Sequence, residues 1–193
     1  MRLTIRKERN MKKFDERTEY ILTQLGLAIE SKDWETVSSL ITLNPETMAL
    51  ALECTYNHLP DEYKFSIPTE CYTHHGDSMP TVRKYVRVAR KFMPDAKRIP
   101  TEFLSMQEIQ VYRAGEEEIG KARYQISWTT DFAVAKWFGE RAIAHGFPPR
   151  HLYAAKIKPE KIICYTDDRN EKEVMQYNSV TDVVEIGVNG LPL

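Results

Sequence analysis

The sequence predicts an α+β fold in which helices come first and strands follow. In roughly the first hundred residues, apolar side chains recur at helical spacing. Beyond Pro100 the chain changes to short runs of β-branched and aromatic residues, bounded by Gly, Asp or Asn, with one further helix among them. We therefore expect a mainly helical lobe over residues 1–105 and an antiparallel or mixed sheet over residues 106–193, together in one compact domain.

Helices are expected at four places in the first lobe. Residues 15–31 place their apolar side chains on one helical face, and a second helix covers 33–41. A third follows "NPET", where Asn44 can cap the helix and Pro45 suits its first position. The fourth covers "TVRKYVRVARKFM", residues 81–93. Prolines at positions 60, 68, 80 and 94 interrupt this lobe. We therefore expect no helix over residues 60–80.

The second part contains six segments with the composition of strands. They are "EIQVYRAG", "RYQISWT", "HLYAAKIK", "EKIICYT", "EVMQYN" and "DVVEIGV". The helix among them runs from about 131 to 145, with Thr129 or Thr130 as its cap and Gly146 as its end. Its apolar side is expected to consist of Phe132, Val134, Trp137, Phe138 and Ile143.

The composition excludes some broad classes of protein. Lys and Arg number 27 against 28 Asp and Glu, for a net charge of −1, which disfavours a non-specific nucleic-acid binder. No apolar run is long enough for a membrane span, and no standard secretion signal is expected. The three cysteines are widely spaced and lack paired motifs, so we expect a reduced, cytoplasmic protein.

Three short stretches carry residues suited to chemistry. These are Arg113 in "VYRAG", Ser127 and Thr129 in "ISWTT", and Glu171 with Glu173 in "RNEKEV". Taken singly, each has a plain alternative: a surface arginine, helix-capping hydroxyls and a solvated turn. In an extended segment, residues i and i+2 point to the same side. Both glutamates are therefore expected to face one cationic partner.

In this order, the three stretches resemble the ADP-ribosyltransferase superfamily, specifically its Arg-Ser-Glu branch with a Glu-x-Glu motif. The resemblance covers about residues 108–187 and is greatest to small ADP-ribosyltransferase-like proteins of bacteriophages and bacteria. It implies a split β-sheet core and a glycosyltransferase that uses NAD as a substrate and needs no metal. The implied acceptor is a protein, in the host cytoplasm if a phage encodes the chain.

The resemblance also implies a role for each motif residue. Arg113 would bind the NAD pyrophosphate with paired donors, and the backbone at Ala114 and Gly115 would hold the nicotinamide amide. Glu173 would stabilise the positive charge that develops on the ribose, and Ser127 would hold its carboxylate. Glu171 would attract and deprotonate an arginine acceptor. The remaining expected NAD contacts are Trp128, Thr129 and Phe138, although the helical spacing of Phe138 with Val134 favours a core position over a stacking platform.

Other functions stay open at this point. The same site with water as acceptor would make a NAD glycohydrolase, and a nucleic-acid acceptor is a further alternative that the neutral charge disfavours. From another class, the chain could be a catalytically silent module that binds NAD or a protein. A metal site at His74, His75 and Asp77 is disfavoured because adjacent histidines on an extended segment face opposite ways.

Overall fold

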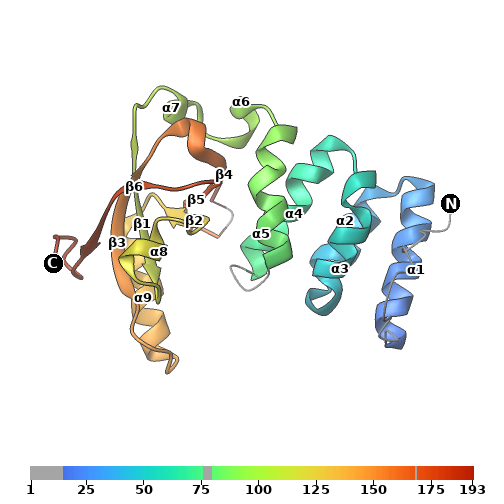
Figure 1. Cartoon of the computed structure of the whole chain (residues 1–193), viewed down its shortest axis with the longest axis horizontal. Coiled ribbons are helices and arrows are strands. Elements are labelled where there is room, and N and C mark those ends of the chain that lie inside the picture. The colour runs from blue at the N-terminus through green and yellow to red at the C-terminus, as the bar shows by residue number, and fades with distance from the viewer. Residues whose placement is uncertain (1–14, 76–79, 168) are drawn as a thin grey trace. The chain divides into compact units, whose positions relative to one another are not determined.

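The computed structural model describes residues 15–75, 80–167 and 169–193. The chain divides into two compact units, Met1–Met93 and Pro94–Leu193. Helices make up the described part of the first unit, and the second contains the sheet, so the predicted α+β class is confirmed (Figure 1). The division between Met93 and Pro94 comes earlier in the chain than the boundary at residue 105 that we expected from composition.

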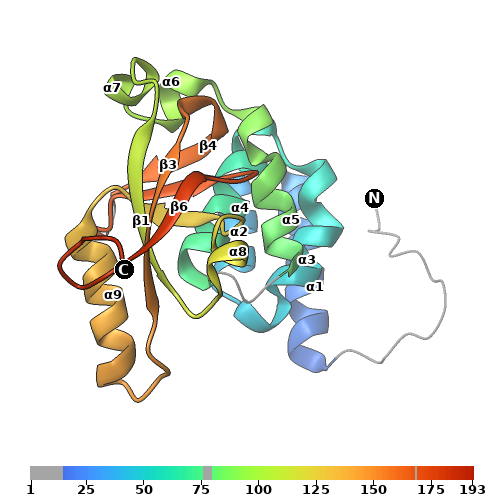
Figure 2. The same ribbon diagram turned by 60° about the vertical axis from the view of Figure 1, so that its left-hand side comes forward.

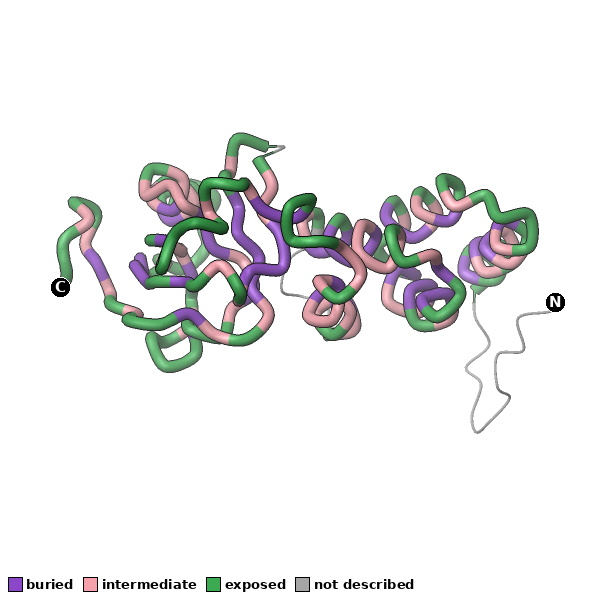
Figure 3. Tube along the Cα trace, turned by 90° about the horizontal axis from the view of Figure 1, so that it is seen from above, coloured by how far each residue is buried: buried purple, intermediate pink, exposed green. Residues whose placement is uncertain are grey.

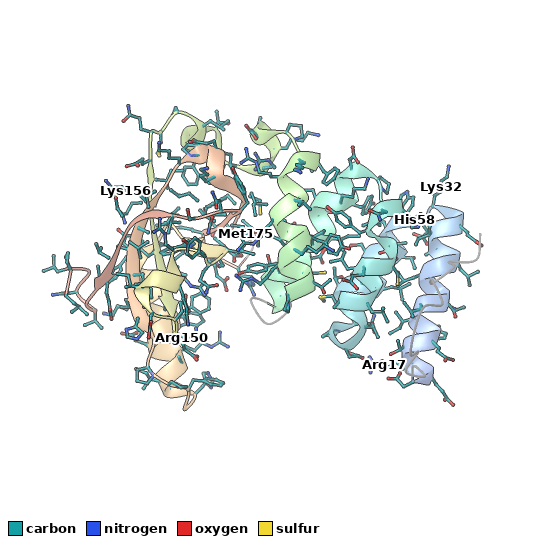
Figure 4. All side chains as sticks on the ribbon, viewed as in Figure 1. Arg17, Lys32, His58, Arg150, Lys156 and Met175 are labelled. Carbon is teal, nitrogen blue, oxygen red and sulfur yellow. The ribbon has the colours of Figure 1, made fainter. Side chains whose placement is uncertain are left out.

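The helices of the first unit agree with the predicted segments, with one addition. They are α1 (Glu16–Ser31), α2 (Trp34–Thr42), α3 (Pro45–Thr55), α4 (Asp61–His75) and α5 (Pro80–Ala89). Arg17 and Lys32 mark the two ends of α1 in Figure 4. Pro45 occupies the start of α3 as expected, but Asn44 makes no capping bond there; its amide donates instead to the carbonyl of Leu40, at 2.8 Å.

Helix α4 was missed because Pro68 was interpreted as an interruption, whereas it lies inside the helix. A proline has no N–H, so the carbonyl of Lys64, four residues earlier, loses its usual helical donor. The hydroxyl of Tyr56 approaches this carbonyl at 3.4 Å and donates to it. Burial raises the pKa of Tyr56 to about 12, which keeps the phenol protonated as a donor at neutral pH.

Apolar side chains of all five helices form the interior of the first unit. Those with little or no exposure include Leu25, Ile41, Met48, Leu52, Ile67, Val82 and Val86. In Figure 3 the helices of this unit show buried residues on one side and exposed residues on the other. This is the amphipathic pattern that predicted the first helix, over residues 15–31.

The second unit is an antiparallel sheet with short helices before and between its strands. Its strands are β1 (Ile109–Gly115), β2 (Ser127–Thr129), β3 (His151–Ile157), β4 (Ile162–Thr166), β5 (Glu173–Gln176) and β6 (Thr181–Ile186). Its helices are α6 (Asp95–Arg98), α7 (Thr101–Leu104), α8 (Ile119–Ala122) and α9 (Phe132–Ala144). The strand order is β4-β5-β2-β1-β3-β6. All six predicted strands are confirmed, whereas the short helices α6, α7 and α8 were not predicted.

The contact face of α9 differs from the expected apolar side. Ala135, Gly139 and Ala142 are its buried residues, whereas Trp137 is 48% and Ile143 60% exposed. Small residues let the helix approach the sheet closely, and a Cβ at Gly139 would lie 3.5 Å from Leu152. Of the predicted apolar side, Phe132 does pack on the sheet, whereas the prediction is wrong for Trp137 and Ile143, and small residues form the buried contacts of the helix.

The cap of α9 was also predicted incorrectly. Asp131 caps the helix, with its carboxylate accepting from Ala133 N at 2.9 Å. Thr129 instead accepts a hydrogen bond from Asp131 N with its hydroxyl. An aspartate is as good a cap as a threonine, so the sequence alone did not distinguish them. Gly146 follows the helix with a φ of 74°, as expected for a residue just beyond a helix end.

The sheet has an apolar layer on each face. One face carries the larger cluster, which includes Val111, Trp128, Tyr153, Ile157, Ile162 and Val174. On the other face Leu152, Ala154 and Ile186 pack with Tyr112 and Phe132. In Figure 2 the chain after β6 turns back on itself, and Gly190 lies beside Phe132 at the start of α9. Across the described residues, no helix has both the length and the apolar character of a membrane span.

Candidate active site

The central strands bring the three predicted motifs into one part of the second unit. Thr129 of β2 lies opposite Tyr112 of β1 and opposite Glu173 of β5. Ser127 lies opposite Met175, which Figure 4 labels on β5. Sheet pairing, and not sequence proximity, therefore brings these motifs together, since β1, β2 and β5 are adjacent in the strand order.

Ser127 and Glu173 form a direct side-chain contact. Their positions in the β2–β5 ladder are diagonal neighbours on one face of the sheet, within reach of each other. The Ser127 hydroxyl donates to Glu173 Oε1 at 2.5 Å. Glu173 is only 6% exposed, and its other oxygen, Oε2, has no hydrogen-bond partner among the described residues. The carboxylate is thus held at one oxygen, and its second oxygen can accept a donor.

The charge state of Glu173 depends on opposing effects. Burial raises its pKa because it disfavours the ionised form. The hydrogen bond from Ser127 and the positive charges of Arg169 and Arg113 lower the pKa, and the charge of Glu171 raises it again, with a net upward shift. A buried carboxylate with a raised pKa and an oxygen lacking a partner is typical of a functional position.

Arg113 binds the main chain next to this pair and not the glutamate itself. Its terminal nitrogen donates to the Ser127 carbonyl at 2.8 Å, and its Nε donates to Glu117 Oε1 at 2.6 Å. The side chains of Arg113 and Glu117 are only 15% and 14% exposed. Arg113 therefore links the end of β1 to β2 at Ser127, the residue whose hydroxyl contacts Glu173.

Glu117 is a site residue that the sequence did not single out. A Cβ at Gly115 would lie 2.4 Å from its carboxylate oxygens, so glycine leaves the space that this carboxylate fills. The Tyr153 hydroxyl donates to the Glu117 carbonyl and holds its main chain. We expected the backbone at Gly115 to contact the nicotinamide amide, whereas in the structure the space beside Gly115 holds the Glu117 carboxylate. Three successive glutamates, 116–118, gave no signal for choosing the middle one.

Trp128 and Thr129 lie on opposite faces of β2, as alternation along a strand requires. Trp128 is 2% exposed within the larger core cluster, so its side chain does not line the site as expected. Thr129 is also buried, but its hydroxyl donates to the Glu171 carbonyl at 2.7 Å and accepts from Asp131 N at 3.0 Å. Thr129 thus joins the turn before β5 to the start of α9.

The turn that carries Glu171 is not extended. Asn170 and Lys172 have φ angles of 55° and 45°, in the left-handed region that residues other than glycine seldom adopt. We expected Glu171 and Glu173 to point to one side, as residues i and i+2 of an extended segment do. That expectation is wrong, since the residue between them is not in an extended conformation. Glu173 begins β5, whereas Glu171 pairs through Oε2 with Arg169, at 2.7 Å.

Several bonds fix the main chain of this turn. Thr130 N donates to the Lys172 carbonyl at 3.1 Å, and Lys172 N donates to Asp167 at 3.1 Å. The Lys172 ammonium binds Asp131 at 2.9 Å, which lowers the pKa of that aspartate. Strained backbone held by this many contacts is characteristic of functional sites.

Two cavities flank α9. The first, of ≈ 310 Å³, is lined by Ala133, Val134, Trp137, Arg169, Asn170 and Glu171. The second, of ≈ 330 Å³, is lined by Phe138, Arg141, Ala142, His145, Phe147 and Arg150. Phe138 is thus half-buried at a cavity wall, while Ala114 packs near Gly139 on the inner side of the helix.

Arg150, labelled in Figure 4 just before β3, has a buried Nε without a hydrogen-bond partner among the residues that the structure describes. The nearest recorded carboxylate oxygen, on Glu116, lies 4.0 Å away. A guanidinium N–H left in this state favours an anionic ligand in the second cavity.

The histidine motif of the first unit is described only in part. His74 is exposed near the end of α4, which is helical where an extended segment was assumed. Asp77 and the side chain of His75 lie outside the described residues. Elsewhere in the described chain, no group of His, Cys, Asp or Glu is arranged to hold a metal ion.

No family model, curated protein or solved structure matches the chain. The resemblance to ADP-ribosyltransferases therefore stays a prediction made from the motif residues.

Proposed function

We propose that the protein is a mono-ADP-ribosyltransferase, which transfers ADP-ribose from NAD to an arginine of an acceptor protein and releases nicotinamide. The observation that carries this proposal is the buried Glu173 carboxylate, bound at Oε1 by Ser127 and lacking a partner at Oε2 among the described residues. A ribose hydroxyl is a donor of the kind that Oε2 would accept.

The chemistry needs a carboxylate in this state. When the bond between nicotinamide and ribose breaks, positive charge develops on the ribose, as in glycoside hydrolysis. A fixed carboxylate stabilises that charge more than it stabilises the uncharged ground-state ring, and this difference lowers the barrier. Ser127 contributes by holding Glu173 before the substrate arrives, so that little reorganisation is needed.

Arg113 and the second cavity offer groups that suit the other parts of NAD. Arg113 offers a planar set of donors that suits a pyrophosphate, provided that the phosphate displaces Glu117 from Nε. The second cavity adds Arg141 and Arg150 beside the rings of Phe138 and Phe147, a mixture that suits phosphate and an aromatic base or ring. Binding of NAD would thus replace internal contacts with equivalent contacts to the ligand.

Glu171 supports an arginine acceptor. Its carboxylate lies at a cavity wall and already binds a guanidinium, that of Arg169. A guanidinium is a poor nucleophile while protonated, so a carboxylate that attracts it and accepts its proton assists transfer. Water in place of the acceptor would yield ADP-ribose by hydrolysis.

The test is incubation of the wild type, Glu173→Gln and Glu171→Gln with labelled NAD and a bacterial lysate, with two readouts: labelled protein and free nicotinamide. We expect the wild type to give both, Glu173→Gln neither, and Glu171→Gln nicotinamide with little labelled protein. Nicotinamide without labelled protein from the wild type would indicate a NAD glycohydrolase. Neither product from the wild type would contradict both enzymatic functions.

A further inference from the structure

We infer that Arg169 occupies the acceptor subsite as an internal guanidinium and is itself a site of ADP-ribosylation. This inference rests on the proposed function. It goes beyond that function because it names a modification site within the chain and a side chain that every external acceptor must displace.

The first observation is the position of the Arg169 guanidinium. It lies 2.7 Å from Glu171 Oε2, so it occupies the place on this carboxylate that an acceptor guanidinium would take. Its charge also reaches Glu173, whose pKa it lowers. Among the ion pairs of the described residues, the arginine that pairs with Glu171 is Arg169.

The second observation is the cavity around this pair. Arg169 and Glu171 line it together with Val134 and Trp137 of α9. The Trp137 ring is 48% exposed, although a large aromatic side chain is usually well buried. A carboxylate beside an exposed aromatic ring forms a site for a guanidinium, which can pair with the first and stack on the second. Arg141 already makes such a contact with Trp137 at 5.0 Å.

Arg169 is held less firmly than Glu171. The main chain of Glu171 is fixed by Thr129, and the next residue by Asp131 and Asp167. The Arg169 side chain is 44% exposed, and exposed ion pairs contribute little to stability. An incoming arginine can therefore take its place, whereas the carboxylate stays where it is.

The modification step balances as follows. A guanidinium nitrogen of Arg169 forms a bond to C1′ of the ribose, and the bond from C1′ to nicotinamide breaks, with nicotinamide leaving as the neutral base. The proton lost by the attacking nitrogen passes to Glu171 and then to water. The products are ADP-ribosylated Arg169, nicotinamide and one proton, and no oxidant or metal takes part.

The first test is incubation of the purified protein with labelled NAD and no added acceptor, followed by peptide mapping. The variants are Arg169→Lys, which keeps the charge but has no guanidinium, and Arg123→Lys as a control at an exposed arginine. We expect label on Arg169 in the wild type and in the control, and its loss in Arg169→Lys. Label on other residues with Arg169 unmodified would overturn the inference.

A second test requires no catalysis. Agmatine, a small guanidinium compound, is titrated into wild type and Arg169→Ala while the indole signal of Trp137 is followed by NMR. Removal of the Arg169 side chain should tighten agmatine binding about three- to tenfold. In the wild type, agmatine can bind only to the fraction of molecules in which Arg169 has left the subsite, so the apparent affinity is lower by that fraction. Equal affinity in the two proteins would overturn the inference.

The two tests also separate this inference from the proposed function. Release of nicotinamide together with labelling of an acceptor protein, by the wild type but not by Glu173→Gln, supports the transferase whatever happens at Arg169. If nicotinamide is released while Arg169 stays unmodified and agmatine binding is unchanged, the further inference alone fails. If no nicotinamide is released, the proposed function fails, and agmatine binding decides whether Arg169 occupies a guanidinium site.

Discussion

The Ser127 hydroxyl donates a 2.5 Å hydrogen bond to Glu173 Oε1 across the β2–β5 ladder. The sheet register makes this contact, because the two positions are diagonal neighbours in the ladder. Only 6% of Glu173 is exposed, so its ionised form depends on this bond and on nearby positive charge. Most of the expected behaviour of the site follows from this pair.

Replacement of Ser127 should change the pH dependence of the reaction. Because the hydrogen bond lowers the pKa of Glu173, Ser127→Ala should raise that pKa further. The active form is the carboxylate, so the acidic limb of the kcat profile should move to higher pH. At neutral pH, kcat should fall by up to about 100-fold, since the carboxylate also loses its fixed position. Ser127→Thr, which keeps a hydroxyl, is the matched control; an unshifted limb in Ser127→Ala would contradict this role.

Glu173→Gln should stabilise the protein while it abolishes activity. The pKa of Glu173 is raised in the folded state above the ordinary value of 4.5, so its destabilising effect is absent well below that value, grows as pH rises toward the folded pKa and is complete above it. The variant should therefore melt higher than the wild type at pH 7 and at nearly the same temperature at pH 4. Each kcal/mol corresponds to about 2–4 °C for a chain of this size. Calorimetry with Glu140→Gln, an exposed control on α9, measures the difference; a lower melting temperature at pH 7 would contradict the prediction.

Glu117 should compete with phosphate for Arg113. Glu117→Gln removes the carboxylate that binds Arg113 Nε, so the affinity for ADP should rise by about fivefold, or roughly 1 kcal/mol. Gly115→Ala should act in the same direction, because its Cβ displaces the end of the Glu117 side chain. Arg113→Lys should weaken ADP binding. Isothermal titration calorimetry with ADP checks all three, and unchanged affinity in Glu117→Gln would show that Glu117 does not occupy a phosphate position.

Thr129→Val should loosen the acceptor side of the site. The hydroxyl joins the Glu171 carbonyl to Asp131 N, and valine has a similar shape without the bonds. Loss of these bonds in a buried position should cost about 1–3 kcal/mol in the free energy of unfolding. Transfer to agmatine should fall more than nicotinamide release, because the lost bond held the main chain of Glu171, whereas Glu173 is still held by Ser127. Equal losses in both assays would contradict this division.

The sequence predicted most of the second unit because each strand carries its own composition and boundaries. The resemblance in the motif residues also predicted that Ser127 holds the Glu173 carboxylate, and the two side chains form a hydrogen bond. The register that joins them is a property of the whole sheet, and no local pattern contains it. The resemblance supplied this pairing, while the structure supplied its geometry.

The errors have physical causes. Pro68 was interpreted as an interruption of the chain, yet Tyr56 satisfies the carbonyl that the proline leaves without a donor. The bulky residues of α9 were predicted to face the sheet, but close packing there requires Gly139 and alanines. Lys172 adopts a positive φ, which the pattern "EKE" does not signal. Glu117 was missed because its ion pair with Arg113 depends on the path of the chain after β1, which a run of three glutamates does not indicate.

The most direct test of the account is the rate of nicotinamide release from NAD by purified wild type, Glu173→Gln and Ser127→Ala, measured in a single turnover with enzyme in excess. The account predicts release by the wild type, a loss of about 100- to 1000-fold in Glu173→Gln, as for other groups that stabilise transition-state charge, and a smaller loss in Ser127→Ala. Release at the same rate by the wild type and Glu173→Gln, or release by neither while both bind NAD, would contradict it.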